Sequence, residues 1–157
     1  MSATTCNVTS VTTNDLMANN SSASTSFSLS TTIFKTLVVD DNVITGKILA
    51  KILEKEFNHK VTCVMSGSDA LEKLSNENFD IIFMDIDMPK QTGVETCVKI
   101  RNTTVVLEEN RKIPVLAYTT NPWEESFDQA GMNGYIAKPA SPAKVQSELE
   151  KIARNAL

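Results

Sequence analysis

The sequence predicts a doubly wound α/β fold, in which one sheet of five parallel strands carries helices on both faces. From residue 33 to residue 157, short apolar runs alternate with amphipathic stretches in five β-α units. One of these runs, FDIIFMD at 79–85, has four consecutive apolar residues, as expected for a strand covered on both faces. Together these observations favour one domain built around a parallel sheet.

The first unit begins with the β-branched run FKTLVVD at 34–40, which predicts a strand. The stretch VITGKILAKILEKEF at 43–57 follows and predicts a helix, because Ile44, Ile48, Ile52 and Leu53 recur at helical spacing.

Four further units repeat this order. Their predicted strands are KVTCVM at 60–65, FDIIFMD at 79–85, IPVLAY at 113–118 and GYIA at 134–137. Their predicted helices cover 68–78, 94–101, 123–130 and 141–157, the last with Pro142 in its first turn. Ser68 is the candidate cap of the second helix, in which Leu71 and Leu74 face inward.

Residues 1–32 differ in composition, with many Ser, Thr and Asn residues and few large apolar side chains. Such a segment buries too little surface to offset the entropy lost on ordering, so we expect a disordered tail. It contains Asn-x-Ser/Thr triplets, which we expect to be chance matches because no secretory signal is visible.

Composition excludes several classes of protein. The net charge is -4 with no clustered basic stripe, which argues against direct nucleic-acid binding. No stretch approaches the roughly 18 apolar residues of a membrane span. The three cysteines, Cys6, Cys63 and Cys97, suit neither a disulfide framework nor a zinc site and indicate a reducing, intracellular setting. We expect Cys63 and Cys97 to be inert core thiols and His59 to be structural or at the surface.

Polar residues follow the predicted strands at one edge of the sheet, where open parallel sheets bind their ligands. They are Asp40 and Asp41 after the first strand, Asp85 and Asp87 after the third, Thr119 and Thr120 after the fourth and Lys138 after the fifth. Crowded carboxylates require a cation, and oxygen ligands of this kind suit Mg²⁺. A lysine and a hydroxyl beside that ion would bind phosphate, and a central aspartate could form an aspartyl phosphate. The pattern therefore indicates a phosphoryl site.

These residues also carry a family resemblance. The motifs Asp40-Asp41-Asn42, Asp85 with Met88-Pro89 and Gly93, Thr119, and Lys138-Pro139 closely resemble those of the CheY-like receiver domain of two-component response regulators. The resemblance extends from Phe34 to the C-terminus and implies a receiver domain over 33–157. It also implies the flavodoxin-like (βα)5 strand order 2-1-3-4-5, which periodicity alone does not predict.

The resemblance implies a role for each acidic residue. Asp85 is the expected phosphoacceptor and also a ligand of the Mg²⁺ ion. Asp41 binds the ion directly, Asp87 contributes its backbone carbonyl, and Asp40 acts indirectly.

The resemblance implies that Lys138 and Thr119 act with Asp85 as catalytic residues, and that Thr119 and Tyr135 form a switch. Lys138 contacts the phosphate, and its bond to Pro139 is expected to be cis. Thr119 moves toward the phosphate and lets Tyr135 swing inward.

Two pairs of residues depart from the usual pattern of this family. Thr45 and Gly46 replace a polar pair such as Asn-Arg, and Gly46 costs roughly 1 kcal/mol relative to alanine within a helix. Asp87 and Asn121 occupy positions that flank the path of the attacking water in this family, so they bear on the lifetime of the phosphoryl group.

The resemblance further implies a phosphorylated regulator and not a turnover enzyme. We expect no effector domain on either side, so that the output is phosphorylation-dependent binding to a downstream protein. The tail and RKIPVLAYTTN at 111–121 resemble stand-alone fungal receivers of stress signalling. The implied donor is a histidine-phosphotransfer protein fed by a hybrid histidine kinase. The implied location is the cytoplasm, with the nucleus as a second compartment.

Two alternatives stay open. DIDMP at 85–89 also resembles the Asp-x-Asp motif of haloacid-dehalogenase-type phosphatases, in which Asp87 would be a general acid. There, however, the motif normally ends the first strand, and this chain is short for the later motifs. The second alternative is a pseudo-receiver that binds proteins without being phosphorylated. Retention of the acidic pair, Asp85, Thr119 and Lys138 argues against it.

Overall fold

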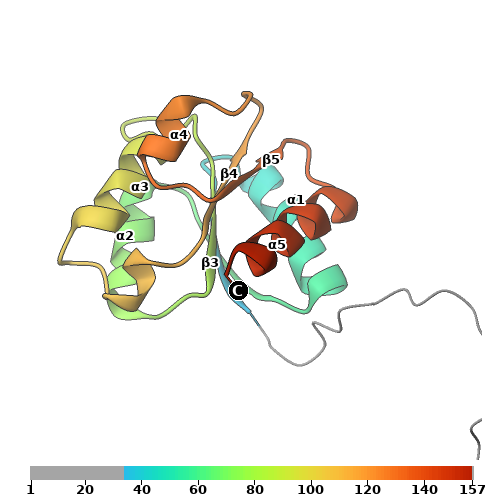
Figure 1. Ribbon diagram of the computed structural model, residues 1–157, viewed down its shortest axis with the longest axis horizontal. Helices are drawn as coiled ribbons and strands as arrows, with labels where there is room; N and C mark the ends of the chain where they lie inside the picture. Colours follow the sequence, from blue (N-terminus) through green and yellow to red (C-terminus); the bar gives the residue numbers. More distant parts are fainter. Residues whose placement is uncertain (1–33, 157) are drawn as a thin grey trace, which may run out of the picture. The chain divides into compact units, whose positions relative to one another are not determined.

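A computed structural model describes residues 34–156, which form a parallel sheet between two layers of helices (Figure 1). The strands are β1 (Lys35–Val39), β2 (Lys60–Val64), β3 (Ile81–Met84), β4 (Val115–Thr119) and β5 (Gly134–Ala137). Their order is β2-β1-β3-β4-β5, and every neighbouring pair is parallel. The predicted doubly wound fold and the order 2-1-3-4-5 are therefore confirmed. The predicted tail at 1–32 lies outside the described residues.

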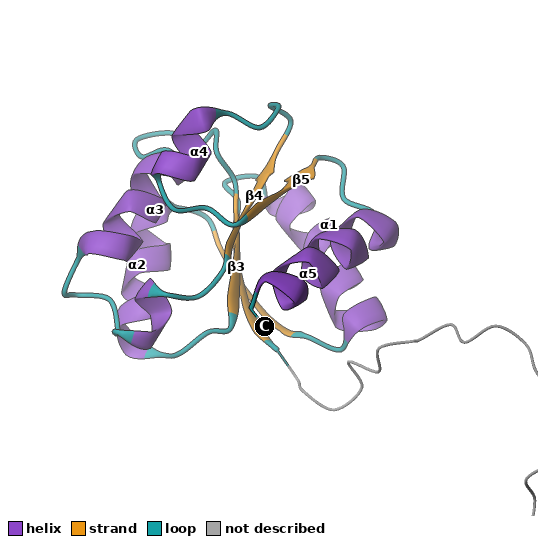
Figure 2. Cartoon of the chain, viewed as in Figure 1, coloured by secondary structure: helices purple, strands orange, loops and turns teal. Residues whose placement is uncertain are grey.

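The helices divide between the two faces of the sheet (Figure 2). They are α1 (Val43–Phe57), α2 (Gly67–Asn76), α3 (Gly93–Asn102), α4 (Glu125–Gln129) and α5 (Pro142–Asn155), with a 3-10 turn η1 (Glu109–Arg111) before β4. Helices α1 and α5 pack on one face, and α2, α3 and α4 pack on the other. Within the described part of the chain, no helix has the length and apolar character needed to cross a membrane.

Within the run at 79–85, residues 81–84 are continuously apolar because both faces of strand β3 are buried. Ile81 and Phe83 join the core beneath α1 and α5, whereas Ile82 and Met84 join the core beneath α2, α3 and α4. All four side chains are almost fully buried. Asp85 follows directly, so a rigid central strand sets its position.

Helix α1 has the predicted bounds, but only part of the apolar pattern that predicted it is buried. Its buried positions are Gly46, Leu49, Ala50 and Leu53. Ile44 is 70% exposed and Ile48 is 45% exposed. Helical periodicity predicts that a helix forms, but here two apolar stripes compete and only the packing decides which one meets the sheet.

Two smaller expectations were wrong. Ser66, not Ser68, caps α2, because the Ser66 Oγ accepts a hydrogen bond from the Asp69 N–H at 3.1 Å. Cys63 is exposed, since β2 is an edge strand, although Cys97 is buried as expected. His59 is structural: it is buried, and its Nδ1 lies 2.8 Å from the Thr36 hydroxyl.

Candidate functional site

The carboxyl ends of the parallel strands bring the predicted site residues together. Asp40 and Asp41 follow β1, Asp85 follows β3, and Lys138 follows β5. The Lys138 Nζ lies 2.9 Å from the Asp40 Oδ2 and 3.0 Å from the Asp85 Oδ2. Residues far apart in the sequence thus form one charged cluster.

Backbone hydrogen bonds extend the sheet into this cluster. The Asp40 N–H donates to the Val64 carbonyl at 3.1 Å, and the Asp85 N–H donates to the Val39 carbonyl at 2.8 Å. The Lys138 N–H donates to the Thr119 carbonyl at 2.9 Å. Each charged side chain therefore rises from backbone that the sheet holds in place.

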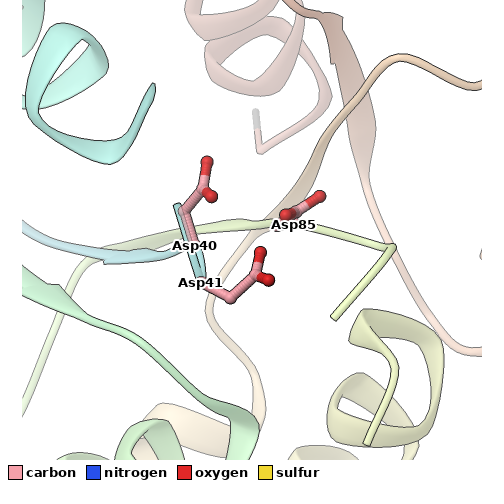
Figure 3. A group of neighbouring side chains, drawn as sticks. All are labelled: Asp40, Asp41 and Asp85. Atoms are coloured by element: carbon pink, nitrogen blue, oxygen red, sulfur yellow. The ribbon is translucent and has the colours of Figure 1, made fainter. Parts of the chain in front are cut away.

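The three aspartates face a common space, and a carboxylate oxygen from each lies within 4.8 Å of the others (Figure 3). Asp40 and Asp85 are buried, whereas Asp41 is more accessible. A compact group of hard oxygen ligands suits Mg²⁺, which binds through a few carboxylates and retains several waters. The residues predicted for the metal therefore fit it chemically.

Asp85 has fewer compensating contacts for its charge than Asp40, the other buried aspartate of the cluster. Burial raises its pKa to about 6, against the opposing effect of the hydrogen bond from Lys138. Apart from the lysine, it accepts only a long hydrogen bond of 3.4 Å, from the Asp87 N–H to its Oδ1. Its ionised form therefore gains from any further positive charge brought to the site.

Both carboxylate oxygens of Asp40, in contrast, have hydrogen-bond partners. Its Oδ1 accepts from the Asn42 N–H at 2.8 Å, and its Oδ2 accepts from the Thr45 hydroxyl at 2.7 Å as well as from Lys138. The side chain of Asp40 is only 1% exposed. The sequence does not predict the contact from Thr45, because nothing in the motif Asp40-Asp41-Asn42 points to it.

Lys138 remains charged despite its partial burial. Burial alone would lower its pKa, but the hydrogen bonds and charges of Asp40 and Asp85 outweigh that effect and raise it. The ammonium also lies 4.9 Å from the centre of the Tyr118 ring, within the range of a cation–π contact. The bond from Lys138 to Pro139 is cis, as the resemblance implies.

Gly93 is required by its close approach to Asp85. A Cβ at this position would lie 2.1 Å from the Asp85 carbonyl oxygen, which leaves no room for a side chain. The Gly93 N–H donates to the Ile86 carbonyl at 2.9 Å and begins α3 against the end of β3. This glycine therefore shapes the loop after Asp85.

The second polar group of the site links the loops after β3 and β4. The Asp87 Oδ2 accepts from the Asn121 side-chain amide at 2.7 Å and from the Thr119 hydroxyl at 3.5 Å. The Thr119 hydroxyl in turn accepts from the Asn121 N–H at 3.1 Å. The sequence marked all three residues but did not predict that their side chains bond to one another.

Tyr135 lies apart from the acidic cluster. It is half-buried in β5, and the centre of its ring is 6.5 Å from that of Trp123, in an edge-on arrangement. Trp123 also packs edge-on against Phe127, and its indole N–H donates to the Asp128 carboxylate at 2.9 Å. The Tyr135 ring thus lies beside Trp123, at the margin of the core beneath α2, α3 and α4.

The fold and this site define a known class of protein domain. A family model for the response regulator receiver domain matches residues 36–150. The chain belongs to this family. Receiver domains accept phosphoryl groups, are not typical turnover enzymes, and work with histidine kinases or phosphotransfer proteins.

Relatives by sequence include both kinases and regulators. The chain is 38% identical over 128 residues to hybrid signal transduction histidine kinase L of Dictyostelium discoideum, an alignment that covers 77% of this chain and 7% of the kinase. It is 33% identical over 125 residues to the transcriptional regulatory protein ResD of Bacillus subtilis, covering 78% of this chain and 49% of ResD. The chain therefore spans less than half the length of these relatives.

Solved structures of similar fold include two receivers. Chemotaxis protein CheY4 of Vibrio cholerae matches with a TM-score of 0.69 and 26% identity, over 77% of this chain and 99% of CheY4. The receiver domain of sensor histidine kinase PA1611 from Pseudomonas aeruginosa matches with a TM-score of 0.66 and 29% identity, over 76% of this chain and 97% of that domain. The latter was crystallised with a magnesium ion coordinated in its active-site cleft.

Proposed function

We propose that this chain is the phospho-accepting receiver of a His-to-Asp phosphorelay and that Asp85 is its phosphoacceptor. The observation that carries the proposal is the position of Asp85, which is buried at the end of a central strand, 3.0 Å from Lys138 and grouped with two other carboxylates. A carboxylate nucleophile needs this combination of a fixed direction and nearby positive charge.

The transfer joins Asp85 to the phosphorus of a phosphohistidine. A carboxylate oxygen forms the new P–O bond while the P–N bond breaks, and the released imidazole takes up a proton from solvent. Lys138 binds the phosphoryl oxygens as a point charge. Asp41, Asp85 and the Asp87 carbonyl would hold Mg²⁺, with Asp40 acting indirectly. When bound, Mg²⁺ offsets negative charge on the transferring group. The same site later loses its phosphoryl group slowly to water.

The output we propose is a change in protein binding. Thr119 would leave Asp87 to bind the phosphoryl group, and Tyr135 would then move inward and alter the surface of α4, β5 and α5. A downstream protein reads that surface. The donor is a histidine-phosphotransfer protein supplied by a hybrid histidine kinase, in the cytoplasm or the nucleus. A stress pathway of fungal type is the context suggested by the sequence of the tail and of residues 111–121.

The test is the intact mass of the protein after incubation with acetyl phosphate, with and without Mg²⁺. We expect one adduct of about 80 Da, the HPO₃ increment, which requires Mg²⁺ and is absent from the Asp85→Asn variant. Asp69→Asn is the matched control, because Asp69 is an exposed residue of α2 that does not belong to the carboxylate cluster. An adduct that persists in Asp85→Asn would contradict the assignment of the phosphoacceptor.

Each alternative has its own distinguishing result. A phosphatase would hydrolyse a generic phosphate ester in many turnovers and lose that activity in Asp87→Asn. The carboxylate of Asp87 already accepts two hydrogen bonds, which disfavours a role as general acid. A pseudo-receiver would form no adduct, and it would bind its partner equally well as wild type and as Asp85→Asn.

A further inference from the structure

Thr45 has a contact that none of the recognised motifs assigns. Its hydroxyl donates to the Asp40 Oδ2 at 2.7 Å. We propose that Thr45 is a positioning residue, which fixes the orientation of the Asp40 carboxylate and thereby the Mg²⁺ affinity of the acidic cluster. The inference rests on the Mg²⁺ site of the proposed function.

The first turn of α1 explains why a threonine can have this role. Asn42 is the N-cap, and Thr45 is the third residue of the helix. In α3 the equivalent residue, Glu95, accepts from the N–H of its N-cap Thr92 at 2.9 Å, which forms a capping box. In α1 the carboxylate that accepts the N-cap N–H is instead Asp40, at 2.8 Å from the Asn42 nitrogen.

Because Asp40 takes the place of the capping-box glutamate, the third residue of α1 has a different hydrogen-bonding role. Because Asp40 already provides the acceptor, a glutamate at position 45 would place a second carboxylate against it. The Thr45 hydroxyl instead donates a hydrogen bond to the Asp40 carboxylate. The hydroxyl of Thr45 also contacts the Asn42 carbonyl at 3.0 Å, so two acceptors fix its direction. The helix terminus and the acidic cluster are therefore built as one hydrogen-bonded unit.

The same oxygen of Asp40 receives Lys138, so Thr45 also affects how the lysine is shared. Lys138 lies 2.9 Å from Asp40 and 3.0 Å from Asp85. Without the hydroxyl, the Asp40 Oδ2 keeps only the lysine, and its burial limits replacement by water. The carboxylate then turns toward Lys138, and the cation site loses an oxygen held in a fixed direction. Outer contacts of this type typically alter metal affinity by about 10- to 100-fold.

The test is direct titration of the protein with MgCl₂ in a calorimeter, without any phosphodonor. Thr45→Val keeps the branched shape and removes the hydroxyl, and we expect its dissociation constant to rise about tenfold. Thr45→Ser restores the hydroxyl and should bind within about threefold of wild type. Thr104→Val, in the exposed loop after α3, is the matched control and should bind as wild type does.

Thermal unfolding of each variant verifies that it is folded, and Thr45→Ala replaces the valine variant if the latter does not fold. Wild-type affinity in a folded Thr45→Val or Thr45→Ala variant overturns this inference alone. An equal loss in the serine and valine variants also overturns it, because side-chain shape and not the hydroxyl would then matter. No Mg²⁺ binding by the wild type overturns the proposed metal site and this inference together.

Discussion

The two ends of the sheet both bury polar groups, but they differ in how completely those groups are paired. At the amino end, buried Asn110 bonds three backbone groups, and Thr36 pairs with His59. At the carboxyl end, Asp40, Asp41 and Asp85 lie close together, and Lys138 pairs with only Asp40 and Asp85. At the amino end, hydrogen bonds within the fold pair these buried polar groups. The carboxyl end retains uncompensated negative charge, which is what a site for a cation requires.

The largest expected effect is at the amino end. The Asn110 Oδ1 accepts from the Phe79 N–H at 2.9 Å, and its Nδ2 donates to the carbonyls of Leu74 and Glu77, both at 2.8 Å. Asn110→Ala leaves these groups unpaired, so we expect the free energy of unfolding to fall by about 2 to 4 kcal/mol in urea titrations.

Asn76→Ala is the control for this experiment. Asn76 donates to the Glu72 carbonyl at 2.8 Å, but it is exposed, and we expect its loss to cost no more than about 0.5 kcal/mol. Equal losses in the two variants would mean that burial of Asn110 does not set the cost.

The second prediction is that replacing Asp85 stabilises the protein, whereas replacing Asn110 destabilises it. Burial raises its pKa from 3.8 to about 6, so the folded protein retains a proton that the unfolded chain releases in that window. Stability therefore falls as the pH rises through it. Asp85→Asn removes this penalty, and we expect it to stabilise the protein by about 1 to 3 kcal/mol at pH 7 in EDTA.

Chemical denaturation of both proteins between pH 4 and pH 7 provides the measurement. The advantage of Asp85→Asn should shrink toward the acidic limit, where the wild-type carboxyl group is protonated as well. A difference that stays constant over this range would contradict a penalty due to charge.

The third prediction is that acid lowers the free energy of unfolding through His59, at the amino end of the sheet. Burial lowers the pKa of His59, and the nearby Asp80 only partly opposes this effect. As the pH falls below 6.5, the unfolded chain takes up a proton that the folded protein resists, and stability decreases. His59→Gln should therefore flatten the acid side of the curve of unfolding free energy against pH. An unchanged slope in this variant would show that another group titrates there.

The smallest expected effect is at Gly46, beside the acidic cluster. A Cβ here would lie 3.5 Å from the Asp40 Cβ and 3.9 Å from the Val38 Cγ1, which are ordinary contacts. Gly46→Ala should then stabilise the protein by about 0.5 to 1 kcal/mol through helix propensity alone. Urea titration measures the gain, and calorimetry with MgCl₂ should show unchanged affinity. A loss of stability would indicate that α1 moves to admit the methyl group.

Most of the fold could be predicted from the sequence because apolar runs and amphipathic stretches alternate without interruption. The sequence did not decide which apolar face of α1 packs on the sheet, because its pattern allows two packings. Ile44 and Ile48 form an apolar stripe as regular as the buried one, and only the sheet selects between them. The exposure of Cys63 follows from the edge position of β2, which depends on the strand order and not on the local sequence.

The site could be located because parallel strands place their following residues at a common edge. The roles assigned to those residues remain predictions. Contacts between side chains were not predictable, since they depend on loop geometry. The bond from Thr45 to Asp40 requires the first turn of α1, and the bond from Asn121 to Asp87 requires two loops to meet. These contacts join residues within the site that the sequence treats as separate.

The edge-on contact between Trp123 and Tyr135 has a practical consequence. Trp123 is the only tryptophan in the chain, so all indole emission comes from this one place. Trp123 is 37% exposed, and its surroundings include the ring of Tyr135, which we propose moves on phosphorylation. The protein thus carries its own optical label, with which the proposed movement of Tyr135 can be tested in a cuvette, at native sequence and without a dye.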